Sequence, residues 1–466
     1  MDIEKTTEKK SGIPLRMWMV FIIIGLAGQF AWSVENMYLN TYITYLNFTD
    51  KTGIGFNYSL MIAITTACSA IVAMLTTIFM GALTDRIGHK KLFISVGYSV
   101  WGIATASFGL LNVNSDNDII KISMSAFTAA VMVVVIDCLM TYFGSTANDA
   151  SFNSYVTSHT DDSNRSKVEG VLGILPLVSM LFIFVGLNGL TTKDNGYRWD
   201  IFFYIIGGLV FLVGILSFFL LPKEKEKTNS ETYVKLLVDG FKPKTVKTNK
   251  KLYLILLVYF IFSTACQVYF PYLMTYIEYS CSIANSGSSF LTPFAIVMAI
   301  ALIGGSALSV VFGFLSDKVG RNKMIIPSLM VFALGLLLMF FIPTIASDTM
   351  RMVYGAIACL LMILGFVGVP TVINALVREY IPKGREGSFM GVRMLFVVAL
   401  PMCIGPFIGD AFNGVYGKPH MGDYGVVSNL PSSFGYLMAF ALVFLTLIPL
   451  YFYFKELKKG TDEHAQ

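Results

Sequence analysis

The stretch Gly81-Ala-Leu-Thr-Asp-Arg-Ile-Gly-His-Lys-Lys-Leu92 recurs in altered form as Gly313-Phe-Leu-Ser-Asp-Lys-Val-Gly-Arg-Asn-Lys-Met324. The two copies are 232 residues apart in a chain of 466, and each lies between two long apolar segments. A glycine-bracketed turn that repeats at half the chain length predicts that the chain is built from two copies of one helical bundle.

The composition places these bundles in a membrane. Hydrophobic residues make up 55% of the chain and charged residues 14%, with a mean hydropathy of +0.68. A soluble protein of this size would have too few polar side chains to cover its surface. Apolar runs of about 20 residues cross the hydrocarbon core, and they predict an all-α polytopic membrane protein with twelve transmembrane helices in two pseudo-symmetric six-helix bundles. The expected spans are 17–43, 58–83, 91–112, 124–157, 169–190, 200–221, 252–276, 290–315, 325–345, 351–376, 388–411 and 432–454.

One span, one loop region and the cysteines raise particular expectations. The fourth span is either a long, tilted helix or a helix whose outer end lies along the membrane interface. Glycine and proline punctuate 405–431, which predicts loops at the outer face. Of the six cysteines, five are expected to be small packing residues, and Cys281, near an external loop, is the exception that could be reactive.

Basic residues are distributed unequally between the two sides of the predicted membrane. With the N-terminus inside, the cytoplasmic segments hold 27 of the 34 Lys and Arg residues, the external segments hold 6, and Arg393 lies within a span. This positive-inside pattern predicts a multi-pass protein of the plasma membrane with both termini in the cytoplasm. The expected division is a tail at 1–16, bundles at 17–221 and 252–454 joined by a basic linker at 222–251, and a tail at 455–466. The net charge of +5 indicates contact with anionic lipid headgroups and no nucleic-acid partner.

The repeated turn has a chemistry of its own. Glycine supplies the backbone freedom that two closely spaced helices need to reverse direction within about seven residues. Asp85 and Asp317 are expected at the cytoplasmic edge, where a carboxylate can bind an arginine or a helix N-terminus and act as a latch. The basic residues alone could simply mark the inner face. The candidate gate residues are Gly81, Asp85, Arg86, Gly88, Lys90, Gly313, Asp317, Gly320, Arg321 and Lys323.

This turn resembles the signature of the major facilitator superfamily, Gly-x-Leu-x-Asp-Arg-x-Gly-Arg-Lys. Residues 81–91 match it except that His89 replaces an arginine, and the second copy matches at Gly313, Leu315, Asp317, Gly320, Arg321 and Lys323. The resemblance covers nearly the whole chain. It implies a secondary transporter of twelve helices that works by alternating access between its two halves.

A narrower resemblance links spans one and four to the glycoside-pentoside-hexuronide:cation symporters and the related sucrose transporters. It is carried by Gly25-Leu-Ala-Gly-Gln-Phe-Ala-Trp-Ser-Val-Glu-Asn-Met-Tyr-Leu39, Ser145-Thr-Ala-Asn-Asp-Ala-Ser-Phe-Asn153 and Asp162-Ser-Asn-Arg-Ser-Lys-Val-Glu-Gly170. It implies a sugar or glycoside substrate and a cation-binding role for Asp149. The family's other acidic cation ligands fall on Gln29, Ala73 and Thr77. This difference favours a proton over sodium as the coupling ion.

Ionisable groups within the spans are few. An ionisable side chain at the bilayer centre costs roughly 2.5 to 3.5 kcal/mol on insertion scales, so each one normally has a partner or a function. Glu35 lies beside Asn36 and one turn after Trp32, where it could accept sugar hydroxyls or carry a proton, or be hydrated near the interface. Asp149 and Asn153 form a polar stripe or a helix cap near the cytoplasm, and Asp137 is surrounded by apolar residues. Arg393 could pair with an acid of the other half or extend to the cytoplasmic interface.

Span seven contains Pro271 close to Gln267 and Tyr269. A helix interruption at mid-membrane is a suitable place for a substrate site, although a simple kink would give the same pattern. With the acids, the candidate substrate or coupling residues are Trp32, Glu35, Asn36, Asp137, Asp149, Asn153, Gln267 and Tyr269.

Several motifs are missing from the sequence. There is no phosphate loop of the Gly-x-x-x-x-Gly-Lys-[Ser/Thr] type, and the four histidines lie in loops or tails, so no metal site or cofactor is expected beyond a coupling H⁺ or Na⁺. The chain is not expected to be an enzyme. The predicted function is a monomeric, proton-coupled sugar symporter, and the first alternative is a proton-coupled exporter of lipophilic compounds. An integral-membrane enzyme and a non-transporting sensor are weaker alternatives.

Overall fold

We describe the fold from a computed structural model of the chain. The residues that it describes are 13–87, 89–111, 124–159, 165–192, 196–222, 242–283, 293–380, 392–422 and 425–463. Within these ranges the chain is helical apart from short connections and one small hairpin.

In the described residues, the first half of the chain forms six membrane helices, four of which contain a local irregularity or are followed by a short helical extension. These elements are α1 (Leu15–Ser33), η1 (Val34–Tyr38), α2 (Leu39–Phe48), α3 (Tyr58–Ile87), α4 (Lys90–Ser107), η2 (Phe108–Leu110), α5 (Ala126–Gly144), η3 (Ser145–Phe152), α6 (Asn153–Ser158), α7 (Arg165–Gly186), η4 (Asn188–Thr191) and α8 (Trp199–Leu220).

The second half repeats this plan after a short helix, α10 (Pro243–Thr248). Its elements are α11 (Lys250–Tyr269), η6 (Phe270–Tyr272), α12 (Leu273–Thr275), η7 (Tyr276–Ser280), α13 (Pro293–Val319), α14 (Arg321–Phe341), η8 (Ile342–Thr344), α15 (Asp348–Tyr380), η9 (Leu395–Ala399), α17 (Leu400–Tyr416), β1 (Pro419–Met421), β2 (Val427–Asn429), α18 (Phe434–Leu445) and α19 (Leu447–Glu463).

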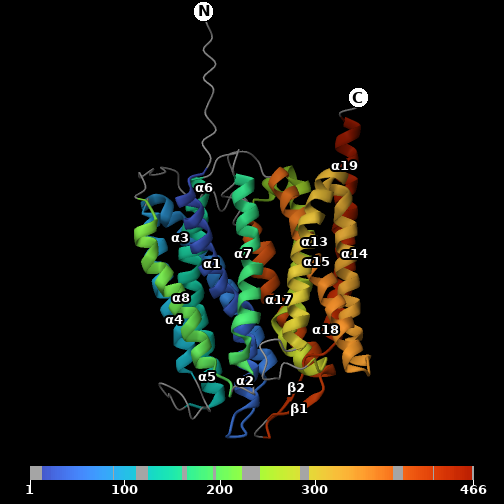
Figure 1. Cartoon of the computed structure of the whole chain (residues 1–466). Coiled ribbons are helices and arrows are strands. Elements are labelled where there is room, and N and C mark those ends of the chain that lie inside the picture. The colour runs from blue at the N-terminus through green and yellow to red at the C-terminus, as the bar shows by residue number, and fades with distance from the viewer. Residues whose placement is uncertain are drawn as a thin grey trace, which may run out of the picture.

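The twelve predicted spans are confirmed. Among the described residues, ten segments are long and apolar enough to cross a membrane, and two shorter apolar stretches, Val171–Gly186 and Ile296–Gly305, lie within α7 and α13. The fourth span is one long helical run from Ala126 to Ser158, which selects the long-helix interpretation. Viewed from the side, the helices stand roughly parallel, and the start of α1 and the end of α19 both lie at the top (Figure 1).

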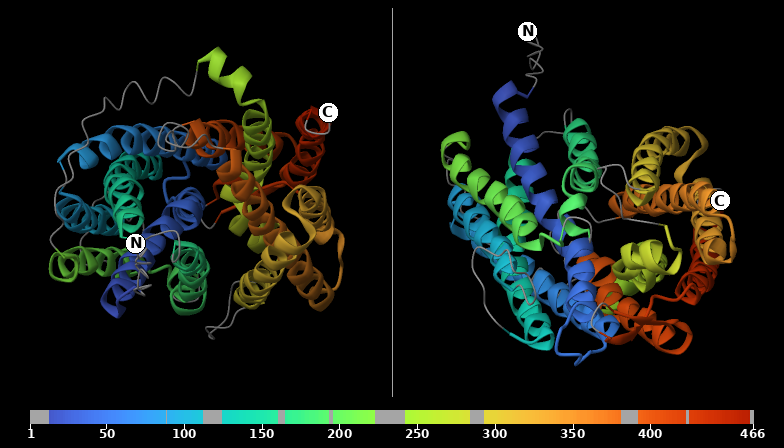
Figure 2. Two further views of the ribbon diagram at one scale, coloured as in Figure 1. Left: turned by 90° about the horizontal axis from the view of Figure 1, so that it is seen from above. Right: turned by 60° about the horizontal axis from the view of Figure 1, so that its bottom comes forward.

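The helices form two groups, one from each half of the chain, which lie side by side when viewed along the helix axes (Figure 2). Within the first group, α4 and α8 approach so closely that their backbones nearly touch at Gly102 and Gly207. A Cβ atom added to Gly102 would lie 2.3 Å from the backbone nitrogen of Phe211. Small residues at such crossings allow membrane helices to pack through their backbones.

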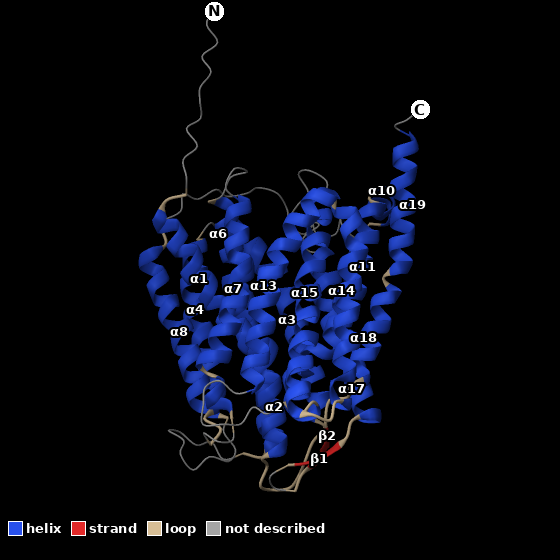
Figure 3. Ribbon diagram, turned by 45° about the vertical axis from the view of Figure 1, so that its right-hand side comes forward, coloured by secondary structure: helices blue, strands red, loops and turns tan. Residues whose placement is uncertain are grey.

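The two halves are joined by polar contacts at the end opposite the chain termini, which we call the hairpin end because β1 and β2 lie there (Figure 3). The hydroxyl of Tyr58 donates to the Asn429 carbonyl oxygen at 2.7 Å, and the Asn413 amide donates to Ser59 Oγ at 3.0 Å. The Tyr272 hydroxyl also donates to the Ser59 carbonyl oxygen at 3.0 Å. Nearer the centre, Cys403 Sγ lies 3.8 Å from the Ala67 carbonyl oxygen. Among the described residues, the hydrogen bonds between the halves lie from this level toward the hairpin end, so the structure is closed there.

The second copy of the repeated turn stays within the expected seven residues: α13 ends at Val319 and α14 begins at Arg321, with Gly320 between them at φ 102°. A positive φ at this position favours glycine, which allows the two helices to follow each other so closely.

Two local expectations need correction. The segment 405–431 is mostly not loop, because α17 continues to Tyr416 and β1 pairs antiparallel with β2.

The second correction concerns Cys281. Its side chain is only 1% exposed, and burial raises the pKa of its thiol above the ordinary value. Because the thiolate is the reactive form, Cys281 is a packing residue like the other buried cysteines.

Candidate functional site

Two acids from different helices meet beside a small cavity at mid-membrane. Glu35 lies on η1 in the first span, and Asp137 lies on α5 in the fourth. Ser69 on α3 donates a short hydrogen bond to Glu35 Oε1, and its Oγ lies 2.9 Å from Thr141 Oγ1. Since the Ser69 proton is engaged by Glu35, the Thr141 hydroxyl is the donor to Ser69.

Each acid retains an unused acceptor. Glu35 Oε2 and Asp137 Oδ1 are buried, and neither has a hydrogen-bond partner among the described residues. Asp137 is 1% exposed, and its carboxyl group is close enough to that of Glu35 for the two to interact electrostatically. The described lining contains no lysine, arginine or histidine that could neutralise either acid. Burial of an unpaired carboxylate is expensive, so this arrangement is well suited to bind a proton or a cation.

The backbone at Glu35 explains how its side chain reaches this cavity. Residues 34–38 form one π-helical turn between α1 and α2, and a second π segment, η3, interrupts the fourth span. A π turn inserts an extra residue into the helical repeat, shifts the faces that follow it and occurs frequently at functional sites.

The second half supplies the opposite wall of the cavity. Gln267, Phe270, Pro271 and Met402 face the acids, together with Asn36, Asn40, Thr65 and Thr66 of the first half. Span seven is broken here, because α11 ends at Tyr269 and a 3₁₀ turn carries Pro271. The predicted helix interruption is therefore confirmed. In this conformation the cavity is about 10 Å³, which is room for about one water molecule.

The structure brings four of the eight candidate residues together in this cavity: Glu35, Asn36, Asp137 and Gln267. Trp32 lies one turn away, where the Asn36 amide donates to its carbonyl oxygen at 2.8 Å and its ring lies 5.0 Å from that of Trp101.

The other three candidates do not line the cavity. Asp149 accepts a hydrogen bond from the Asn148 amide at 3.2 Å, although it is near enough to Glu35 to interact electrostatically. The side chain of Asn153 is exposed and its amide donates to the Asp149 carbonyl oxygen. Tyr269 is 2% exposed and stacks on Tyr436 at 5.0 Å inside the second bundle, so it is a core residue.

The gate motif is described only in part. Gly81 and Asp85 lie within α3, and Gly313 and Asp317 lie within α13, but the side chains of Asp85, Arg86 and Asp317 are outside the described residues, as is Gly88. Lys90 begins α4, and Lys323 is exposed. Arg321 pairs with Glu379 at 3.8 Å on the surface. The latch stays a prediction.

Some residues of this site were not among the predicted candidates. Ser69 and Thr141 link the acids, and Thr65 and Ser69 share one face of α3 because they are four residues apart. A polar stripe on an otherwise apolar helix was the available signal. Arg393 donates to Asn374 Oδ1 at 3.0 Å within its own half, and both interpretations drawn from the sequence stay predictions.

Comparisons with known proteins agree on one family. A family model described as Major Facilitator Superfamily matches residues 17–406. Two crystal structures of the nucleoside transporter NupG, one of them a mutant, resemble this fold with TM-scores of 0.67 and 0.65 at 12% and 13% identity. They cover 95% of this chain and 100% and 99% of NupG.

A third structure is a bacterial homologue of the human lysosomal transporter Spinster, in an inward-facing and unoccupied conformation. It has a TM-score of 0.59 at 16% identity and covers 95% of this chain and 97% of its own. No curated protein matches the chain by sequence.

Proposed function

Because the chain belongs to the Major Facilitator Superfamily and is therefore a membrane transporter, we propose that it is a proton-coupled symporter of a sugar or glycoside. The observation that carries this proposal is the pair of buried acids, Glu35 and Asp137, beside a cavity lined by both halves.

The acid pair supports a coupling role. Two carboxyl groups in one low-dielectric site cannot both be ionised cheaply, so they can share a proton. Ser69 and Thr141 form a hydroxyl chain on Glu35 that can reorient when the proton arrives or leaves. Sodium remains the alternative coupling ion, because carboxylate and hydroxyl oxygens are also ligands for a hard cation.

The polar side chains around the acids suit a hydroxylated substrate. Asn36, Asn40 and Gln267 carry amides that can both donate and accept hydrogen bonds, and Phe270 offers an apolar ring. The cavity is too small for a sugar in this conformation. Substrate binding therefore requires the halves to move apart, as alternating access provides.

We assign the hairpin end to the outside and the chain termini to the cytoplasm, in agreement with the distribution of basic residues. Since the halves are joined by hydrogen bonds at the hairpin end, the structure then represents an inward-facing conformation. The plasma membrane is the proposed location, and a monomer the proposed state.

The experiment is counterflow in proteoliposomes against a panel of labelled sugars, glycosides and nucleosides. Nucleosides are included because they are N-glycosides and because NupG is a nucleoside transporter. We expect one or more panel members to accumulate when the outside is made acid, with no requirement for sodium. If accumulation strictly requires sodium, then sodium, not the proton, is the coupling ion. Efflux of lipophilic dyes with no uptake of any panel member would contradict the symporter and support the exporter.

A further inference from the structure

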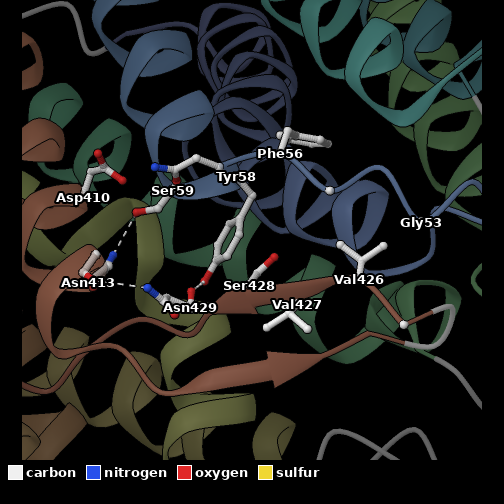
Figure 4. A pocket seen from close by; sticks show the side chains of 14 residues that line it. Gly53, Phe56, Tyr58, Ser59, Asp410, Asn413, Val426, Val427, Ser428 and Asn429 are labelled. Atoms are coloured by element: carbon white, nitrogen blue, oxygen red, sulfur yellow. Dashed lines mark hydrogen bonds between the residues drawn. The ribbon is translucent and has the colours of Figure 1, made fainter.

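A second, much larger cavity lies at the hairpin end, away from the acid pair. Its volume is about 460 Å³, which is in the range of small-molecule sites. Its walls come from both halves: residues 53–59 of the first, and α17 and the hairpin of the second (Figure 4). We propose that this cavity is an external binding site for a small monovalent organic cation.

The charge of the lining carries this inference. Asp410 is the only charged residue among the described residues that line the cavity. Its Oδ1 is buried and has no hydrogen-bond partner among the described residues. Its carboxyl group is close enough to the side chains of Ser59 and Asn57, in the other half, to interact with both, and Figure 4 shows Asp410 beside Ser59. Neutral amides and hydroxyls cannot balance a carboxylate, whereas a bound cation would.

Several of the other polar groups that line the cavity are occupied in joining the halves. The Asn413 amide donates to Ser59 Oγ, and the Tyr58 hydroxyl donates to the Asn429 carbonyl oxygen. Asn413 Oδ1 in turn accepts from the Ser432 backbone nitrogen at 2.8 Å. These bonds fix the wall, and Oδ1 of Asp410 takes part in none of them.

Part of the remaining lining is apolar and suits a cation that carries alkyl groups. Val426 and Val427 of the hairpin offer apolar contact, and Phe56 adds an aromatic ring that can interact with a cation. A strongly hydrated metal ion would gain nothing from these side chains. An alkylammonium ion matches both the acid and the apolar wall.

Occupancy would also bias the conformational cycle, a consequence that depends on the proposed alternating access. Because both halves contribute walls, the cavity is complete only while the hairpin end is closed. A ligand that binds one state preferentially increases the population of that state. An external cation would therefore hold the transporter inward-facing and inhibit uptake.

Binding is tested on the purified full-length protein with choline as the probe. Its neutral isostere, 3,3-dimethyl-1-butanol, has the same shape without the charge. We expect choline to raise the midpoint of thermal unfolding and to give a binding isotherm, and the isostere to give neither. Asp410→Asn should weaken choline binding by about tenfold, which corresponds to a loss of about 1.4 kcal/mol.

Two further variants make the result interpretable. Val427→Lys places a cation at the mouth of the cavity on a residue that is 60% exposed, and it should also abolish choline binding. Asp348→Asn removes an exposed acid elsewhere and should leave binding unchanged. The proposal is overturned if choline does not bind, if the isostere binds equally well, or if both cavity variants bind choline like the wild type. If choline binds at this site but does not inhibit uptake, the site stands and the claim that it is complete only in the closed state is contradicted.

Discussion

The closure of the hairpin end can be tested by removing a single oxygen atom. Tyr58 is 1% exposed, and its hydroxyl donates to the Asn429 carbonyl oxygen of the other half at 2.7 Å. Tyr58→Phe removes this bond while retaining the ring, which packs on Phe48 at 5.5 Å. A typical intramolecular hydrogen bond contributes about 1 kcal/mol net. Its loss should raise the ratio of open to closed molecules at this end about fivefold.

Tyr42→Phe is the matched control. Tyr42 is also 1% exposed, and its hydroxyl donates to the Leu111 carbonyl oxygen at 2.8 Å, but both residues belong to the first half. This change should lower stability by a similar amount without altering the open-to-closed ratio.

The assay is the distance distribution between probes at Ile54 and Met421, in a background lacking the six native cysteines. These residues are exposed and belong to opposite halves at the hairpin end. Tyr58→Phe should enlarge the long-distance population, whereas Tyr42→Phe should not. Equal distributions in the two variants would refute the assignment of this hydrogen bond to the closed gate.

Three further predictions concern packing and chemistry elsewhere. Gly102→Ala should lower thermal stability by about 1–3 kcal/mol because its Cβ would collide with the α8 backbone. Gly208→Ala is the control, since a Cβ there meets nothing within 4 Å, and it should not lower stability. Equal unfolding midpoints for the two variants would contradict the close crossing of α4 and α8. Tyr269→Phe should leave substrate affinity within about twofold of wild type, since the residue is buried in the second bundle and its hydroxyl has no partner among the described residues. A large loss of substrate affinity in the counterflow assay would show that Tyr269 contributes to substrate binding. Cys281 should react with a thiol reagent only when the protein unfolds, since burial raises the pKa of its thiol; rapid labelling of the folded protein near neutral pH would show that it is accessible.

The membrane fold was predictable because its physical signal is strong. Twelve apolar runs, one repeated turn and one side rich in basic residues all indicate the same architecture. The break at Pro271 was also predictable, since proline removes a backbone donor and clashes with the preceding turn.

The composition of the acid site was only partly predictable. Glu35, Asn36, Asp137 and Gln267 could each be selected, because polar groups are conspicuous in apolar helices. That they converge on one cavity could not be predicted, because the π turn at 34–38 alters the helical register and nothing in the local pattern indicates this turn. Tyr269 was selected with Gln267, but residues two apart point to different faces of a helix, and the structure places Tyr269 in the core.

The central claim is that the buried acids couple transport to a proton gradient, and Glu35→Gln tests it most directly. The amide keeps the size of the side chain but cannot take up and release the coupled proton. We predict that the variant retains counterflow of the substrate and loses its accumulation driven by an outside-acid gradient, while Asp348→Asn retains both. Undiminished accumulation by Glu35→Gln would contradict the account.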